Sequence, residues 1–243
     1  GGGGKAAVAI VNGHFAEILV GKSFDSISDI SEIWDFLYTA SIPYGRKGVA
    51  IMALSGVDLA LFDALGKAEM KPVANLLGST IKDQMRCYAT GPDTNYYAEL
   101  GFTAQKFPFQ WKGNESEAVG VAMGEKARSA FGKDAEVMFD VYMTWNSEIT
   151  LKMHKALKHV GIHWYEDILT PDNLEELGVL RTKIYPVNMA GGEHEFTAHG
   201  FADIARTKAY DIWQPDITWC GGITAGLQII NLALANNAEV VPH

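Results

Sequence analysis

Apolar residues in the first third of the chain recur at two different spacings. Over residues 28–40 and 48–70 they return roughly every three to four positions, which is typical of amphipathic helices. Residues 5–20 instead hold two short apolar runs around Asn12-Gly13, a dipeptide that favours a tight turn because both positions tolerate positive φ. This segment predicts a β-hairpin. The hairpin and the helices together predict part of an α+β capping domain over residues 1–80.

From residue 84 onward, short apolar runs alternate with amphipathic helical segments. Strands are predicted at 85–89, 102–107, 136–140, 163–166, 187–192, 211–214 and 239–241, and helices at 96–100, 115–131, 147–159, 174–182, 198–208 and 225–236. This alternation implies parallel strands joined by right-handed crossovers. The number of strands is close to the eight of a (β/α)₈ barrel, so residues 81–243 predict an α/β barrel domain with strands 1 to 7.

Composition and charge narrow the classes of partner. The chain has 243 residues, 48% of them hydrophobic, and a net charge of −9, which argues against a nucleic acid or an anionic membrane as partner. Its longest apolar stretch is interrupted by Asp58 and Asp63, so no membrane helix is expected. Two distant cysteines suggest no disulfide framework and fit a reducing, cytoplasmic compartment. The four opening glycines lack the strand and helix of a phosphate loop and suggest a linker.

A titratable residue stands at or near the carboxyl end of six successive predicted strands. These residues are Lys106, Asp140, Glu166, Glu193, Asp216 and His243. They are separated by 23 to 34 residues, about one strand-helix unit each time. Because the carboxyl ends of parallel barrel strands share one face, the six side chains are expected to converge on one mouth.

Three of these residues are acids on consecutive strands. Ionised carboxylates held close together repel one another and raise each other's pKa, so three of them require a cation. Asp140, Glu166 and Glu193 therefore suggest Mg²⁺, a hard ion bound by oxygen ligands. A single acid at a strand end is more often a helix cap or a solvated loop residue, and that alternative stays open for each one taken alone.

Several stretches of the sequence resemble the enolase superfamily, within its mandelate racemase-like group of sugar-acid enzymes, and most of all the L-rhamnonate dehydratases. They are "SGVDLALFDALGKAEMKPVANLLGS", "YATGP", "ELGFTAQKFP", "WYEDILTP", "GGEHEFT", "QPDITWCGG" and "VVPH". The resemblance implies a capping domain over a (β/α)₇β barrel. It also implies Mg²⁺ bound by the three acids, and a dyad in which Asp216 orients the proton-abstracting His243.

The second predicted strand separates two reactions within this group. Racemases of the group carry a Lys-x-Lys pattern that supplies a second base, whereas this chain has Lys106-Phe107-Pro108. The resemblance therefore implies a hydro-lyase that removes the α proton of an aldonic acid, L-rhamnonate or a similar one, and eliminates the β-hydroxyl as water. Lys106 would stabilise the developing negative charge. An epimerase or racemase, or a catalytically silent barrel, remains the alternative.

Other residues near the predicted strand ends allow two interpretations. His194 matches a histidine of the rhamnonate dehydratase motif and suggests a substrate contact or an acid, or a hydrogen-bonding neighbour of Glu193. Glu195 departs from the motif, which more often has a histidine there. The side chains of Trp145, Trp164 and Trp219 suit either a sugar pocket or packing. The resemblance also implies a homo-oligomer, and an eighth strand and a specificity loop lying outside this sequence.

Overall fold

A computed structural model describes residues 3–78 and 82–243, and they divide into two compact units. The first unit comprises Gly1–Asp83, Gly192–Asp203 and Trp213–His243, and the second comprises Gln84–Gly191 and Ile204–Ile212. The predicted boundary between residues 80 and 81, and the first two of the opening glycines, lie outside the described residues. That boundary stays a prediction.

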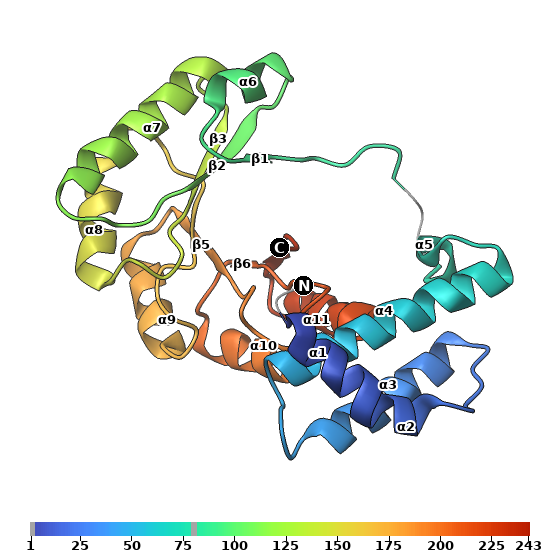
Figure 1. The fold of residues 1–243 in the computed structure, drawn as a ribbon. Coiled ribbons are helices and arrows are strands. Elements are labelled where there is room, and N and C mark those ends of the chain that lie inside the picture. Colours follow the sequence, from blue (N-terminus) through green and yellow to red (C-terminus); the bar gives the residue numbers. More distant parts are fainter. Residues whose placement is uncertain (1–2, 79–81) are drawn as a thin grey trace. The chain divides into compact units, whose positions relative to one another are not determined.

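The first unit is mainly helical. Its helices are α1 (Gly4–Ile10), the π-helix η1 (Val11–Phe15), α2 (Ala16–Leu19), α3 (Ile27–Ser41), α4 (Val49–Glu69), α5 (Val73–Leu76) and α11 (Gly222–Ala235). Figure 1 shows α1, α3 and α11 beside the long helix α4. The helices predicted at 28–40, 48–70 and 225–236 are confirmed within three residues at each end.

The predicted β-hairpin at residues 5–20 is wrong, because this segment is helical from Gly4 to Leu19. Asn12 and Gly13 lie inside η1, and neither adopts the positive φ that a tight hairpin turn needs. The apolar side chains at 7, 10, 11, 15 and 18 instead follow a helical spacing. Phe15 is fully buried in the hydrophobic core of the first unit, and the others pack against the same core. Burial on one helical face outweighed the local turn preference.

Helix α3 begins with a capping box that its sequence encodes. The Ser26 hydroxyl accepts the Asp29 N–H at 3.2 Å, and the Asp29 carboxylate accepts the Ser26 N–H at 3.0 Å. These reciprocal hydrogen bonds satisfy donors that the first turn of a helix leaves unpaired. They lower the pKa of Asp29, with the backbone N–H of Asp25 as the largest cause. The helix then buries Trp34 and Leu37 against α4.

Helix α4 is the one helix within the described residues that is long and apolar enough to cross a membrane. Its buried side chains, among them Ile51, Leu54 and Phe62, instead belong to two hydrophobic clusters of the first unit. Asp58 lies in the middle of the helix, 1% exposed, and accepts both the N–H and the hydroxyl of Thr224 at 3.1 and 2.6 Å. The helix is therefore a core element here.

The second unit holds most of the parallel sheet. Its strands are β1 (Ala89–Thr90), β2 (Ala104–Pro108), β3 (Glu136–Asp140), β4 (Trp164–Glu166) and β5 (Asn188–Gly191), each paired in parallel with the next. The prediction at 85–89 was wrong over most of its length, because only Ala89 belongs to β1 and Met85 is 69% exposed. The other strand predictions overlap the observed strands.

Helices alternate with these strands as the sequence predicted. They are α6 (Thr94–Glu99), α7 (Glu115–Phe131), α8 (Ser147–Ala156) and α9 (Leu174–Lys183), followed by α10 (Thr197–Thr207). Figure 1 shows α7 next to α8, with α7 lying along β2 and β3. Aromatic rings of this unit form a connected group: Phe109 contacts Phe139 and Trp145, and Trp145 contacts Tyr165.

The sheet continues in chain order through β6 (Ile212–Trp213) and β7 (Glu239–Val240). In the second unit the Asp211 N–H donates to the Met189 carbonyl at 2.8 Å, and in the first the Val241 N–H donates to the Trp213 carbonyl at 3.0 Å. Within the described residues the sheet therefore has seven strands in the order β1 to β7. This order means that neighbours in the chain are neighbours in the sheet.

Candidate active site

The strand register of the second unit brings Lys106, Asp140 and Glu166 together. Asp140 pairs with Glu166 across β3 and β4, and Lys106 pairs with Met138 on β3. Because side chains alternate along a strand, these three side chains share one face of the sheet. The Lys106 ammonium forms an ion pair with the Glu166 carboxylate and lies 3.9 Å from Asp140.

Both partners of the central ion pair are buried, Lys106 to 5% exposure and Glu166 to 0%. Burial lowers the pKa of Lys106, but the negative charge of Glu166 and its hydrogen bond outweigh burial, so the pKa of Lys106 is raised overall. The side chain therefore carries a full positive charge at neutral pH. The second Glu166 oxygen accepts the indole N–H of Trp164 at 2.9 Å, which fixes the orientation of the carboxylate.

The first unit brings Asp216 and His243 together. The His243 Nδ1 atom lies 3.2 Å from one Asp216 oxygen, and the other oxygen accepts the N–H and the hydroxyl of Thr218 at 2.6 and 2.7 Å. An ionised carboxylate only accepts hydrogen bonds, so this contact assigns the Nδ1 proton to the imidazole. The His243 N–H also donates to the Pro215 carbonyl at 3.3 Å. The imidazole is thereby held with Nε2 turned away from Asp216.

Glu193 joins this group through two imidazoles. Its carboxylate oxygens lie 3.1 Å from Nε2 of His194 and 3.1 Å from Nε2 of His243. The indole ring of Trp219 lies against both imidazoles, with ring centroids 6.0 and 5.7 Å apart. Glu193, His194, Asp216 and His243 thus form one polar cluster in the first unit. The roles predicted for these residues, and for the three in the second unit, stay predictions.

Glu195 has a partner that the sequence did not indicate. Its carboxylate is 3% exposed and forms an ion pair with Lys47, whose Nζ lies 2.7 and 2.8 Å from the two oxygens. One of these oxygens also accepts the Phe196 N–H. A Cβ atom at Gly200 would lie 2.2 Å from the same oxygen, so the residue at 200 must be glycine for this packing.

Two other contacts were also missed from the sequence. Thr218 lies two residues after Asp216, a spacing that allows a hydroxyl and an N–H to reach a preceding carboxylate, and this could have been recognised. The ring of Tyr88 lies 5.6 Å from the Lys106 ammonium, a contact that depends on tertiary structure. Nothing local in the sequence signals it, nor the pairing of Lys47 with Glu195.

The sequence left two roles open for three tryptophans, a sugar pocket or packing. Their burial and contacts in the structure distinguish them. Trp145 and Trp164 are 4% and 3% exposed, and Trp145 packs among aromatic rings while Trp164 donates to Glu166. Only Trp219 is partly exposed beside the candidate dyad. Packing is therefore the role of Trp145, and Trp219 remains available to contact a ligand.

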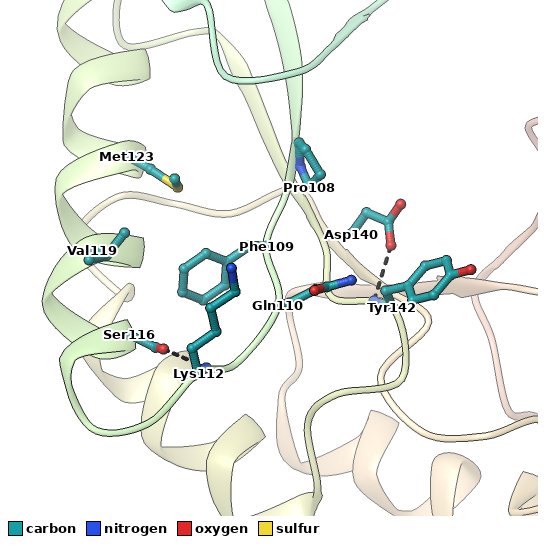
Figure 2. Close-up of a pocket in the computed structure, with 9 residues that line it drawn as sticks. All are labelled: Pro108, Phe109, Gln110, Lys112, Ser116, Val119, Met123, Asp140 and Tyr142. Atoms are coloured by element: carbon teal, nitrogen blue, oxygen red, sulfur yellow. Dashed lines mark hydrogen bonds between the residues drawn. The ribbon is translucent and has the colours of Figure 1, made fainter.

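A cavity of about 480 Å³ adjoins Asp140 in the second unit (Figure 2). Val119 and Met123 of α7 form one side, and Asp140 and Tyr142 form the other, with the side chain of Gln110 between them. The Asp140 carboxylate accepts the Tyr142 N–H at 3.2 Å. One carboxylate of the predicted metal site thus borders a space large enough for a small organic molecule.

The residues fit the Mg²⁺ ion that the sequence predicts. Within the second unit, Asp140 and Glu166 offer carboxylate oxygens from paired positions on neighbouring strands. Hard oxygen donors of this kind are the ligands that Mg²⁺ prefers. In the second unit two carboxylates face the single ammonium of Lys106, so the local charge is negative and favours a cation.

Comparisons with known proteins define the class. Residues 94–243 match the family described as enolase C-terminal domain-like, and residues 1–78 match the N-terminal domain of the mandelate racemase / muconate lactonizing enzyme family. The chain therefore belongs to the enolase superfamily, in its mandelate racemase / muconate lactonizing enzyme group. The predicted fold class, an enolase-type barrel with an N-terminal capping domain, is confirmed.

Individual relatives narrow the comparison. The chain is 38% identical to L-rhamnonate dehydratase of Saccharopolyspora erythraea, over 99% of this chain and 62% of the relative. It superposes with a TM-score of 0.90 on rhamnonate dehydratase from Gibberella zeae complexed with Mg, at 34% identity, covering 98% of this chain and 58% of that one. A racemase from Streptomyces coelicolor with bound magnesium gives a TM-score of 0.88 at 26% identity, covering 98% and 72%. The chain thus spans about three fifths of the rhamnonate dehydratases it matches.

Proposed function

We propose that this protein is a Mg²⁺-dependent sugar-acid dehydratase that converts L-rhamnonate, or a closely related aldonic acid, into a 2-keto-3-deoxy acid. The observation that carries the proposal is the orientation of His243. Asp216, itself held by Thr218, contacts Nδ1 of the ring, so that Nε2 is the nitrogen that would take a proton once a substrate replaces its present contact with Glu193. The similarity to L-rhamnonate dehydratases supports the choice of substrate class.

The reaction needs one proton removed and one returned. His243 Nε2 takes the proton from the carbon next to the substrate carboxylate, and Asp216 stabilises the resulting imidazolium. The C–O bond to the hydroxyl on the next carbon then breaks, and the imidazolium gives its proton to the departing oxygen, which leaves as water. The enol that remains tautomerises to the 2-keto-3-deoxy acid. Because His243 has taken one proton and given one away, its imidazole has regained its starting protonation state.

Lys106 and the three acids would provide the electrostatic stabilisation of the reaction. The Lys106 ammonium, fixed by Glu166, would stabilise negative charge that develops on the substrate. Asp140, Glu166 and Glu193 would hold Mg²⁺, which when bound supplies further positive charge for the substrate carboxylate. His194, beside Glu193, would contact the substrate.

An epimerase or racemase is the second candidate function. The observation in its favour is the similarity to the Streptomyces racemase. Racemisation by two bases needs a second proton acceptor facing His243. The residue two positions after Lys106 is Pro108, whose side chain neither takes nor gives a proton. This difference favours dehydration.

A screen of aldonic acids tests the proposal. The full-length protein is incubated with each acid and Mg²⁺, and the 2-keto-3-deoxy product is measured. We expect turnover of L-rhamnonate or a close analogue, and its loss when Mg²⁺ is chelated. No product from any aldonic acid with Mg²⁺ present would contradict the proposal.

A further inference from the structure

The second unit contains another cavity, of about 520 Å³, which the proposed reaction does not use. It is lined by His154 of α8, by Lys158 after that helix, by Tyr165 of β4, and by Tyr185 and Pro186 before β5. Its volume falls within the roughly 300–1,000 Å³ of small-molecule sites. Side chains alternate along β4, so Tyr165 lies on the opposite face from Glu166. The cavity is therefore separate from the acidic cluster.

Tyr165 belongs to the wall of this cavity, and its hydroxyl is a buried donor. The residue is 0% exposed, and within the described chain its hydroxyl has no hydrogen-bond partner. Burial raises the pKa of Tyr165 far above neutrality, so the hydroxyl keeps its proton. A buried donor without an acceptor destabilises the fold. An acceptor atom of a ligand in the cavity would therefore gain a strong hydrogen bond.

Positive charge lines the same cavity. Lys155 and Lys158 belong to its wall, and among the described residues neither forms an ion pair. The His154 ring meets the Tyr165 ring edge-on with centroids 6.4 Å apart, and its buried Nδ1 has no partner there either. Burial, and then the charge of Lys158, lower the pKa of His154, so its ring is neutral at pH 7.

The remaining wall is apolar and includes Leu157, Ile162 and Pro186. The residues that line the cavity thus include two lysines, a phenol donor and apolar side chains, a combination that suits a small organic acid with a charged end and an apolar body. We propose that this cavity binds a small organic carboxylate, whose oxygens accept from Tyr165 and pair with Lys158 while its apolar body contacts Leu157 and Ile162.

Calorimetry with benzoate as the probe tests the inference. The full-length protein is used with Mg²⁺ chelated, so that a carboxylate cannot bind through the metal site. We expect saturable binding of benzoate, and we expect its neutral analogue benzyl alcohol to bind at least about tenfold more weakly, because it lacks the charged oxygens that would accept from Tyr165 and pair with Lys158. Equal binding of the two probes, or tighter binding of phenyl phosphate than of benzoate, would overturn the carboxylate assignment.

Two substitutions locate the binding. Tyr165→Phe removes only the hydroxyl and should weaken benzoate about tenfold, the effect of one buried hydrogen bond to a charged group. Lys158→Gln should weaken it as well. Tyr96→Phe and Lys126→Gln, at sites outside the cavity wall, are the matched controls and should bind as the wild type.

The thermal midpoint shows whether each variant is folded. Since Tyr165→Phe removes an unpaired hydroxyl, its midpoint without ligand should equal or exceed that of the wild type. Absence of saturable benzoate binding to the wild type, or unchanged binding by a folded Tyr165→Phe variant, would overturn the inference.

Discussion

At the scale of single residues, the candidate dyad depends on how Asp216 is held. One of its oxygens faces His243, and the other takes two hydrogen bonds from Thr218. Thr218→Val removes the hydroxyl donor but keeps the backbone donor and the shape. We expect kcat to fall about tenfold, because a hydrogen bond to a charged group contributes roughly 1.5–3 kcal/mol. Steady-state kinetics measure this, with Thr39→Val on α3 as the control. Unchanged kcat in Thr218→Val would show that Thr218 does not position Asp216.

The ion pair between Lys47 and Glu195 carries a second prediction. Lys47→Met leaves a carboxylate that is 3% exposed without its cation. Because the lysine itself is 55% exposed, we expect a loss of about 1–2 kcal/mol in the free energy of unfolding, between the values of surface and buried pairs.

The double variant shows whether Lys47→Met loses stability because the buried Glu195 charge has no partner or because packing is lost. Adding Glu195→Gln to Lys47→Met removes the buried charge and should restore part of the loss, as urea unfolding would measure. If the double variant is less stable than Lys47→Met alone, the charge of Glu195 is not what the lysine compensates.

Candidate site residues could be predicted from the sequence only where titratable residues recur at a regular spacing along the chain. The six titratable residues were found because each recurs about one strand-helix unit after the last, and the structure places them in two groups of close contacts. Lys47 stands 148 positions before Glu195, and no periodicity links them. Its contact follows from tertiary folding alone.

At the scale of elements, α4 and α11 meet at Asp58. The buried carboxylate accepts two hydrogen bonds from Thr224, close to the start of α11, and a Cβ atom at Gly222 would lie 2.3 Å from it. Burial raises the pKa of Asp58 above 3.8, and the hydrogen bonds from Thr224 offset only part of this. The folded protein therefore favours the protonated acid more than the unfolded chain does.

The sign of this shift gives a pH prediction. A raised pKa contributes stability that is complete below pH 3.8 and is lost as the pH rises through the pKa of the folded state. The free energy of unfolding of wild type minus that of Asp58→Asn should therefore fall as the pH rises from about 3.8, the ordinary pKa of an aspartic acid side chain. Urea unfolding across this range measures it, with the exposed Asp63→Asn as the control on the same helix. A difference that grows with pH would contradict the prediction.

Element boundaries were predictable where periodicity and capping agreed. The helix expected at 115–131 and the strand at 136–140 match α7 and β3. The segment 5–20 failed because Asn12-Gly13 is a strong local turn signal, yet the surrounding apolar residues have a helical face that packs against the same core as Phe15. A short dipeptide preference is weaker than the burial of several side chains.

At the scale of the whole molecule, binding of the predicted Mg²⁺ should stabilise the fold. A ligand that binds only the folded state raises the free energy of unfolding by about 2.7 kcal/mol at a hundred times its Kd. We expect the thermal midpoint to rise with Mg²⁺ and to return after chelation. Glu166→Gln should lose this response, whereas Glu148→Gln, an exposed site on α8, should keep it. A midpoint insensitive to Mg²⁺ at millimolar concentrations would contradict the metal site.

The measurement that tests the central claim most directly follows L-rhamnonate by proton NMR in D₂O with Mg²⁺, comparing the wild type with His243→Asn. We predict a 2-keto-3-deoxy product in the wild type and a rate at least about 100-fold lower in the variant, since general base catalysis contributes roughly 10²–10⁴-fold. Deuterium entering the α carbon without loss of the hydroxyl, or unchanged turnover in His243→Asn, would contradict dehydration by His243.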